Sequence, residues 1–457
     1  MGWLKTYKNL KLPILSLLSC LLFLAALIPQ EKEQSKSFVL ENGLKVFLYE
    51  RHTLPLVNLS FAVNLGTKDE SDETSGLVHL LEHCILFRGT EARSGAEVGQ
   101  DIRRHGAYFN AHTGFDLSLF EISLPSEYTD FALKNQKEIL FNLKLTQEEL
   151  DEEKNVILEE LNQLQDDPLK YGTSLLYQSL FKDHPYQRMA EGKREIVEAA
   201  SAEQVEKFYR KFFVPSNCAL AAVGDFNLEE MEKKVREIFG ELKGEKVSPP
   251  NYEKVISLKK RTEIEQEMDV NSTYLIIGFI GPDYNHPDLS SVDVLTEVLG
   301  RGVNPMLNMP LRGRTNLVNN FSMSYSPYKY GGAIIITMTL DPKNINMAKR
   351  MLFGFLRETG RMQYTKTDYL GEEQFYALDH LQSAKNQIKF RFHQAFEKGL
   401  NLATSLAMDM LLNEKQEGSS YLESILKVSS TDLRKAASTY VSKDRLVIIS
   451  ILPKKKK

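Results

Sequence analysis

Two histidines and a glutamate in one short segment have the residue types and the spacing of a metal site. His79, Glu82 and His83 form the pattern H-x-x-E-H within residues 75–84. In a helix, residues at i, i+3 and i+4 share one face, so these side chains would point into the same volume. The pattern is the inverted form of the H-E-x-x-H zinc motif. In such a site two neutral imidazoles bind Zn²⁺, and the carboxylate accepts a proton from the water that attacks a carbonyl.

The same spacing also occurs in a helix that carries two surface histidines beside an ordinary glutamate. A protein zinc site needs a third ligand, so the rest of the chain must supply one. We expect Thr74 or Ser75 to cap the helix and Gly89 to end it. A second, apolar stripe predicts that the helix is anchored in a core; it consists of Leu77, Leu80, Leu81, Cys84 and Ile85.

A later helix offers two carboxylates. Thr146 and Glu149 form a capping box at its start. On a helical wheel Glu153 and Glu160 lie within about 20° of each other, in an apolar stripe with Val156, Ile157 and Leu164. Buried carboxylates are rarely left unpaired. A buried salt bridge would explain one such glutamate, but it explains less well two glutamates that lie on the same face of the helix.

The two glutamates are separated by roughly 10 Å along the helix, so one ion does not take both. Glu160 is therefore the predicted third metal ligand. Glu153 is predicted to support a ligand or to contact the substrate.

The first thirty residues differ from the rest of the chain. Lys5, Lys8 and Lys11 precede an apolar run over residues 12–28, and the first acidic residue is Glu31. A basic segment followed by an apolar one is typical of a secretory signal. We rank a cleaved signal peptide first, an uncleaved membrane anchor second and lipidation at Cys20 third. The protein is therefore expected to be exported, and to be either periplasmic or anchored in the cell envelope. Membrane contact is expected only through this segment.

Length and charge limit the function further. The 457 residues are enough for two or three domains. The formal charge of −4 includes seven lysines in the N-terminal segment and the C-terminal tail; without them the body carries about −11, which argues against a nucleic-acid partner. Cys84 and Cys218 alone would remain after signal cleavage, so no disulfide framework is expected.

The order of predicted elements indicates a duplication. Asn42-Gly43 joins two apolar runs as in a β-hairpin. Further strands are expected at residues 57–65, 107–111 and 117–124. A second copy follows, with strands at 255–258 and 272–279 and a helix at 288–299 that matches the metal helix but lacks the histidines. We predict an α+β protein with a signal or anchor at 1–30, a zinc-bearing domain at 31–240, a linker at 241–254 and a homologous domain without metal ligands at 255–457.

These features resemble those of the pitrilysin family of zinc metallopeptidases, family M16, in its small two-domain form similar to the mitochondrial processing peptidase subunits. His79 to His83 followed by Leu86-Phe87-Arg88-Gly89-Thr90 resembles the family's metal helix and its exit. In that family 76 residues separate the second histidine from the third ligand, and the same count from His83 reaches Glu160.

The resemblance implies two duplicated domains, each an antiparallel sheet backed by helices, facing across a chamber. It implies a peptide bound as an added strand, with Asn110 and Ala111 on the strand that pairs with it, and Glu153 as a further catalytic carboxylate. Active members also carry an arginine and, seven residues later, a tyrosine in the second domain. Arg312 matches the arginine, but Asn319 stands at the tyrosine position.

The sequence therefore predicts a zinc-dependent endopeptidase for short or unfolded peptides. His79, His83 and Glu160 would bind Zn²⁺, and Glu82 would be the general base. One alternative is a zinc-carrying subunit that needs an arginine- and tyrosine-bearing partner, which leaves a monomer, a homodimer or a heterodimer open. Others are a non-catalytic peptide-binding or assembly protein and a zinc hydrolase that acts on other substrates.

Overall fold

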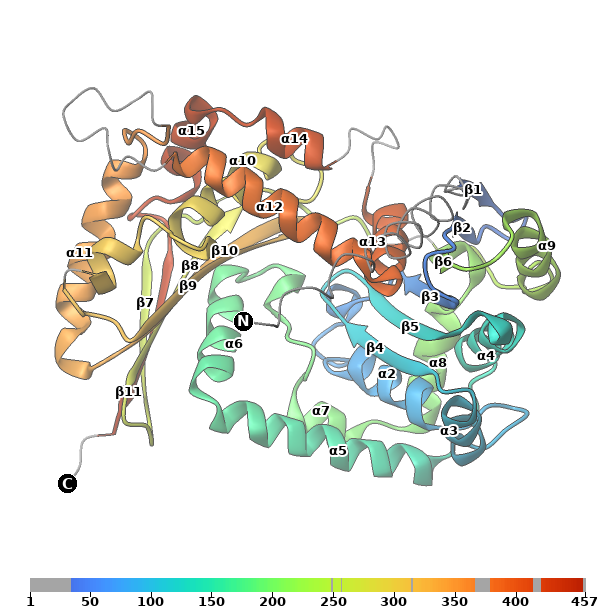
Figure 1. The fold of residues 1–457 in the computed structure, drawn as a ribbon. Coiled ribbons are helices and arrows are strands. Elements are labelled where there is room, and N and C mark those ends of the chain that lie inside the picture. The colour runs from blue at the N-terminus through green and yellow to red at the C-terminus, as the bar shows by residue number, and fades with distance from the viewer. Residues whose placement is uncertain are drawn as a thin grey trace, which may run out of the picture.

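The computed structural model describes residues 34–247, 250–255, 257–313, 315–365, 379–413 and 421–454. The signal or anchor predicted at residues 1–30 lies outside them. Two β-sheets organise the described chain, one in the first half (residues 34–239) and one in the second half (residues 262–454). Each sheet is backed by helices, which confirms the predicted α+β fold (Figure 1).

The first sheet has six strands in the order β1-β2-β6-β3-β5-β4. The predicted hairpin is present: β1 and β2 pair antiparallel, and Gly43 takes a φ of 90° in the turn, a conformation that glycine adopts without steric cost. Among the described residues strand β4 pairs only with β5, so it is an edge strand of this sheet. The strands are β1 Gln34–Val39, β2 Lys45–Glu50, β3 Leu56–Val63, β4 Tyr108–Thr113, β5 Ser118–Pro125 and β6 Cys218–Gly224.

The second sheet has five strands in the order β7-β11-β8-β10-β9. Its pairing repeats that of the first sheet, because one parallel pair, β7 with β11, is followed by three antiparallel pairs. The strand expected at 255–258 is wrong: Val255 and Leu258 lie outside any strand, and the pairing begins at Thr262. The strands are β7 Thr262–Met268, β8 Thr273–Gly281, β9 Asn320–Tyr328, β10 Gly331–Leu340 and β11 Val447–Pro453.

The helices also follow one order twice. In the first half they are α2 Leu77–Phe87, α3 Gly95–Arg104, α4 Thr129–Phe141, α5 Gln147–Asp166, α6 Pro168–Leu180, α7 Arg194–Ala199, α8 Ala202–Phe212 and α9 Leu228–Phe239. In the second half they are α10 Leu289–Thr296 with a π-helical turn at Glu297–Arg301, α11 Ile345–Thr359, α12 His380–Glu397, α13 Gly399–Leu412, α14 Tyr421–Lys427 and α15 Ser430–Tyr440.

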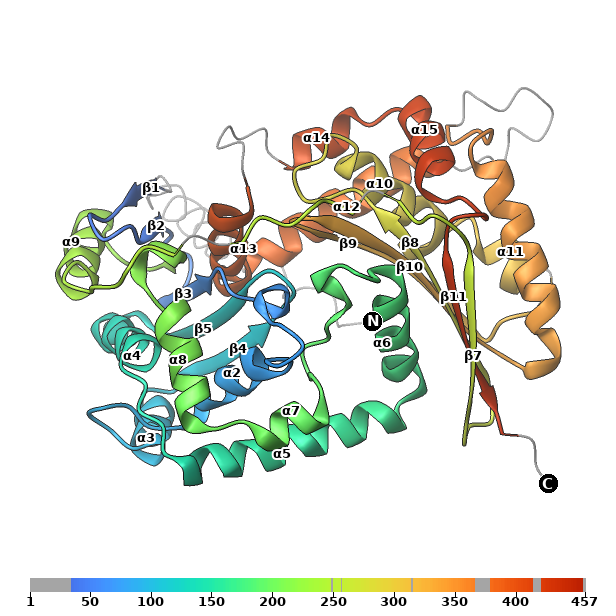
Figure 2. The same ribbon diagram turned by 180° about the vertical axis from the view of Figure 1, so that it is seen from behind.

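Each half covers one face of the other half's sheet with a helix. Helix α6 packs on β8 and β11, and α13 packs on β3 and β6 (Figures 1 and 2). Small residues allow these close approaches: a Cβ at Gly172 of α6 would lie 2.4 Å from the side chain of Ile276. Ala403 and Ala407 of α13 pack against alanines of the first sheet. The halves are therefore held together by exchanged helices that pack in apolar cores.

No helix in the described ranges has the length and apolar character needed to cross a lipid bilayer.

Candidate metal centre

Helix α2 carries His79, Glu82 and His83, and its start is held in an unexpected way. Neither Thr74 nor Ser75 caps it. The N-cap is Gly76, with a φ of 101°, and the carboxylate of the buried Glu70 accepts hydrogen bonds from the backbone N–H groups of Gly76 and Val78. These backbone hydrogen bonds favour the charged form of Glu70, but its burial opposes that form more strongly and raises the pKa overall. The helix ends at Phe87 with Arg88 as its C-cap, directly before Gly89, as expected.

Helix α5 carries the two predicted carboxylates. Its start is the predicted capping box of Thr146 and Glu149. Glu153 is buried, whereas the side chain of Glu160 is 40% exposed. Val156 is exposed too, so the helical wheel was wrong to place it in the core. Ile157 and Leu161 are buried on the same helix, so Glu160 lies at the border of the buried stripe and remains accessible to a ligand.

The side chains of His79, His83 and Glu160 converge between α2 and α5. Their candidate ligand atoms all lie within 4.8 Å of one another. Nε2 of His79 is 3.6 Å from one carboxylate oxygen of Glu160, and Nε2 of His83 is 3.8 Å from the other. The predicted ligand set is thus brought together from two helices.

This arrangement fits a zinc ion. Two ligands bound to tetrahedral zinc at 2.0–2.1 Å lie about 3.4 Å apart, close to the two nitrogen–oxygen distances. Both distances are too long for hydrogen bonds between the histidines and Glu160. Burial, and then the charge of His83, lowers the pKa of His79 to about 4, so His79 is neutral at pH 7 and its nitrogen lone pair is available to a metal.

Glu153 orients His83. Its carboxylate lies 3.2 Å from Nδ1 of His83 and forms an ion pair of 2.5 Å with Arg88. Burial opposes the charged form of Glu153, but its contacts with His83 and Arg88 lower the pKa overall. When Nδ1 of His83 donates to this carboxylate, Nε2 faces Glu160 as a free acceptor. This contact matches the predicted alternative in which Glu153 supports a ligand.

Glu82 lies on the same face of α2 and is buried. Burial raises the pKa of its carboxyl, against a hydrogen bond donated by the Thr113 hydroxyl. Thr113 belongs to the edge strand β4, which packs against α2. The predicted proton acceptor is thus hydrogen-bonded to the strand on which a peptide is expected to pair.

Asn110 and Ala111 lie on β4, as predicted. Ala111 is buried, and Asn110 is partly exposed beside His112. Side chains alternate along a strand, so Ala111 and Thr113 share the face that is directed to α2. The free edge of β4 leaves backbone donors and acceptors for an additional strand.

The structure does not bring Arg312 to the metal centre. Arg312 is exposed in a π-helical turn that packs against α11, and among the described residues it has no ion-pair partner. Three tyrosines further along the chain serve the core of the fold. The Tyr325 hydroxyl donates to the Pro282 carbonyl, Tyr328 is bonded to Tyr177, and Tyr330 is buried.

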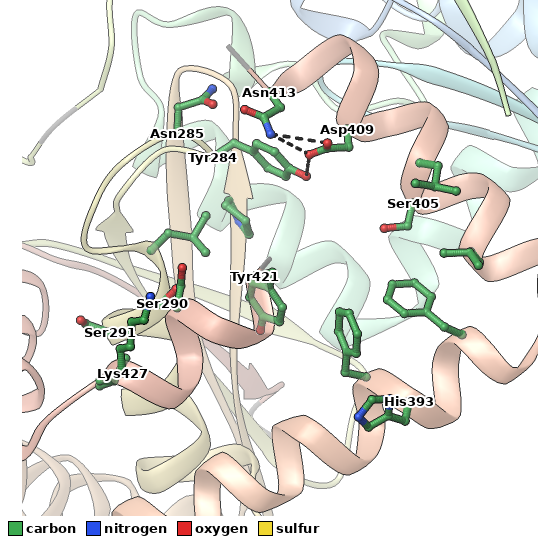
Figure 3. Close-up of a pocket in the computed structure, with 18 of the residues that line it drawn as sticks. Tyr284, Asn285, Ser290, Ser291, His393, Ser405, Asp409, Asn413, Tyr421 and Lys427 are labelled. Atoms are coloured by element: carbon green, nitrogen blue, oxygen red, sulfur yellow. Dashed lines mark hydrogen bonds between the residues drawn. The ribbon is translucent and has the colours of Figure 1, made fainter. Parts of the chain in front are cut away.

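Two of the hollows formed by the described residues contain side chains of both halves, and neither of these two is lined by the metal-centre side chains. One, of about 1570 Å³, is enclosed by α12, α13, α14 and the loop before α10. Figure 3 shows its wall, where Tyr284 and Asn413 bond to Asp409. The other, of about 840 Å³, lies in the angle between α5 and α6.

Three contributors to the centre were missed in the sequence. Thr113 had a signal, because period-2 alternation places it on the face of Ala111. Arg88 was noted only as part of a motif, although it follows His83 closely enough in the sequence for its side chain to lie near the same end of the helix. Glu70 had no local signal, since its bond to α2 depends on the path of the preceding loop.

Comparisons with known proteins agree with this geometry. Residues 45–193 match the family model "Insulinase (Peptidase family M16)", and residues 199–371 match "Peptidase M16 inactive domain". An uncharacterized zinc protease of Rickettsia bellii is 30% identical over 313 residues, 67% of this chain and 73% of that protein. The zinc protease PqqE of Helicobacter pylori is 22% identical over 430 residues, 92% and 93% of the two chains.

Solved structures share the fold. A protease from Helicobacter pylori superimposes with a TM-score of 0.83 at 21% identity and covers 92% of this chain and 100% of its own. A putative M16-like peptidase from Alicyclobacillus acidocaldarius gives 0.76 at 20% identity, covering 92% and 98%. Both solved structures share the fold along nearly the whole of this chain, and the family-model matches extend into both halves. The chain belongs to peptidase family M16.

Proposed function

We propose that the protein is a zinc-dependent endopeptidase that hydrolyses short or unfolded peptides in the cell envelope. The observation that carries the proposal is the convergence of His79, His83 and Glu160 next to Glu82 and the free edge of β4. The named relatives are zinc proteases, which supports the metal and the reaction class. Export by residues 1–30 would place the protein in the periplasm or anchor it to the membrane.

The side chains have separate tasks in this reaction. Bound Zn²⁺ would supply Lewis-acid chemistry, polarising the substrate carbonyl and making water more acidic. Glu82 accepts a proton from the attacking water and returns it to the leaving amine. Thr113 holds the Glu82 carboxylate by its hydrogen bond, and Glu153 holds His83.

The peptide is positioned by the sheet. An extended substrate adds to β4 through backbone hydrogen bonds, with Asn110 and Ala111 in the pairing strand. This mode favours an unfolded or flexible segment, because most backbone donors and acceptors of a folded protein are already engaged in its own structure. Substrate choice therefore depends on chain flexibility first and on side chains second.

A second candidate is favoured by the environment of Arg312. Asn319 stands seven residues after it, and nearby Tyr325 and Tyr328 are engaged in the core. The chain would then be the zinc-carrying subunit of a pair, and a related subunit would supply the arginine and the tyrosine. A third possibility, a peptide-binding or assembly protein without catalysis, is opposed by the complete set of ligand side chains.

The test is a cleavage assay on the purified protein with quenched peptides of graded length, with zinc measured on the same sample. Chelator-sensitive cleavage by the single chain supports the endopeptidase and shows that Asn319 is tolerated. Bound zinc without cleavage favours the subunit that needs a partner. A protein without zinc that still binds peptides would refute the enzyme. Hydrolysis of small esters alone would indicate a hydrolase of another class.

A further inference from the structure

The second half contains residues at the positions of the metal centre. Helix α2 follows β3 and precedes β4, and α10 follows β8 and precedes β9, the matching strands of the second sheet. When the buried residues of the two helices are aligned, Asp293 occupies the position equivalent to His79, and Glu297 occupies the position equivalent to His83. The aligned buried pairs are Leu80 with Val294, Leu81 with Leu295, and Cys84 with Val298.

The position equivalent to the third predicted ligand, Glu160, is found from the junction between two helices in each half. Asp167 joins α5 to α6 with φ −88° and ψ 111°, and Lys398 joins α12 to α13 with φ −80° and ψ 113°. Glu160 lies seven residues before the first junction, and Arg391 lies seven residues before the second. Arg391 is therefore the counterpart of Glu160.

Ion pairs connect these counterparts. Nη1 of Arg391 lies 2.8 Å from Oε1 of Glu297, and the other guanidinium nitrogen bonds the second carboxylate oxygen. Arg301 bridges the two acidic residues, with contacts of 2.8 Å to Glu297 and 2.8 Å to Asp293. Tyr421 of α14, visible in the wall of the hollow in Figure 3, donates a hydrogen bond to Asp293.

The charges explain the arrangement. Glu297 is almost fully buried and Asp293 nearly so, and two neighbouring buried carboxylates that stay charged need cations to offset their desolvation and mutual repulsion. Arg301 and Arg391 together bring two positive charges, the formal charge of one Zn²⁺. Bidentate arginine–carboxylate bonding also fixes direction, as metal ligation does.

We infer that the second half retains the layout of the metal centre with the guanidinium groups of Arg391 and Arg301 in place of an ion, and that this ion-pair cluster fixes α12 to α10 without any metal. The cluster acts at a distance from the peptide, so Arg391 is a positioning residue. Helix α12 leads into α13, which packs on β3 and β6 of the zinc-bearing half and whose Thr404 donates to Glu121 of β5. The metal-free cluster thus holds the helix that covers the far face of the catalytic sheet.

Hydrogen exchange of the full chain tests the metal independence. On removal of zinc with a chelator, peptides from α2 and α5 should exchange faster, whereas peptides from α10 and α12 should not change. The Arg391→Met variant should show roughly tenfold or faster exchange in α10 and α12 and keep its zinc. Arg357→Met is the control, since Arg357 is exposed on α11 and pairs only with its neighbour Glu358 among the described residues. Unchanged exchange in Arg391→Met would overturn the inference.

A gain of metal tests the correspondence itself. The variant Asp293→His, Glu297→His, Arg391→Glu, Arg301→Phe copies the first half's residues at four matched positions, because Arg301 matches Phe87. Two equivalents of zinc per chain, against one for the wild type, are expected by metal analysis. A folded variant with one equivalent would refute the matched geometry; if the variant does not fold, the exchange experiment decides. The inference rests on the proposed metal centre, and wild-type protein without zinc would count against that centre while the Arg391→Met result stays readable.

Discussion

Nδ1 of His83 lies 3.2 Å from the carboxylate of Glu153, and that carboxylate also pairs with Arg88 at 2.5 Å. The relationship links α2 to α5 beside the metal ligands. It predicts that Glu153→Gln weakens zinc binding by about 10- to 100-fold, because the neutral amide no longer fixes the protonation of His83. Competition with a chelator of known affinity measures this.

Glu152→Gln is the matched control for that experiment. Glu152 is also bonded to Arg88, at 2.6 Å, but it is largely exposed and does not touch His83. Equal losses in the two variants would show that Arg88, rather than the contact with His83, controls the affinity.

Glu82→Gln should keep zinc and lose turnover by about 10²- to 10⁴-fold, because the amide cannot accept the proton of the attacking water. Zinc content and peptide cleavage are measured on one preparation. Glu159→Gln, an exposed position on α5, should cleave normally. Substantial cleavage by Glu82→Gln would exclude it as the base.

His79→Ala should lose zinc, and cleavage with it, because two protein ligands hold the ion poorly. Chelator treatment of the wild type should abolish cleavage, and added zinc should restore it. His393→Ala changes an exposed histidine on α12 and is expected to retain both. Stoichiometric metal in His79→Ala would contradict the ligand assignment.

Thr113→Val keeps the shape of the side chain and removes the hydrogen bond to Glu82. We expect kcat to fall by about 10- to 100-fold, since a hydrogen bond to a charged group contributes roughly 1.5–3 kcal/mol, with zinc content unchanged. Thr113→Ser should restore kcat because it keeps the hydroxyl. If Thr113→Ser is as slow as Thr113→Val, the hydroxyl alone does not account for the effect, and the assigned role of the hydrogen bond is refuted.

Glu70 predicts a pH-dependent stability. Burial raises the pKa of its carboxyl to about 8, against the backbone hydrogen bonds at the start of α2. Between about pH 5 and 8 the folded chain then holds a proton that the unfolded chain has lost, so stability falls as pH rises, by at most about 1.4 kcal/mol per pH unit.

Glu70→Gln keeps an acceptor for Gly76 and Val78 and removes the titration. With chelator present, its thermal midpoint should rise relative to that of the wild type as the pH increases from 5 to 8.5. Glu73→Gln changes an exposed residue of the same loop and should leave the profile unaltered. Parallel profiles for Glu70→Gln and the wild type would show that Glu70 does not titrate in this range.

The sequence determined the local features of this protein. The spacing of His79, Glu82 and His83 requires only one helix to place them together, and the capping box at Thr146 defines where the second helix starts. The strand alternation and the hairpin at Asn42-Gly43 are likewise local. Such signals survive in a sequence because they depend on neighbours within a few residues.

Tertiary structure decided what depends on distant segments. The helical wheel could not separate buried Glu153 from accessible Glu160, or show that Val156 faces solvent, because the elements packed on α5 set its exposure. The cap of α2 by Glu70, the hydrogen bond of Thr113 to Glu82 and the exchange of α6 and α13 between the sheets arise from the path of the chain in space. The pairing of Glu297 with Arg391, 94 residues apart, arises in the same way: only the folded chain brings such charges close enough to replace an ion.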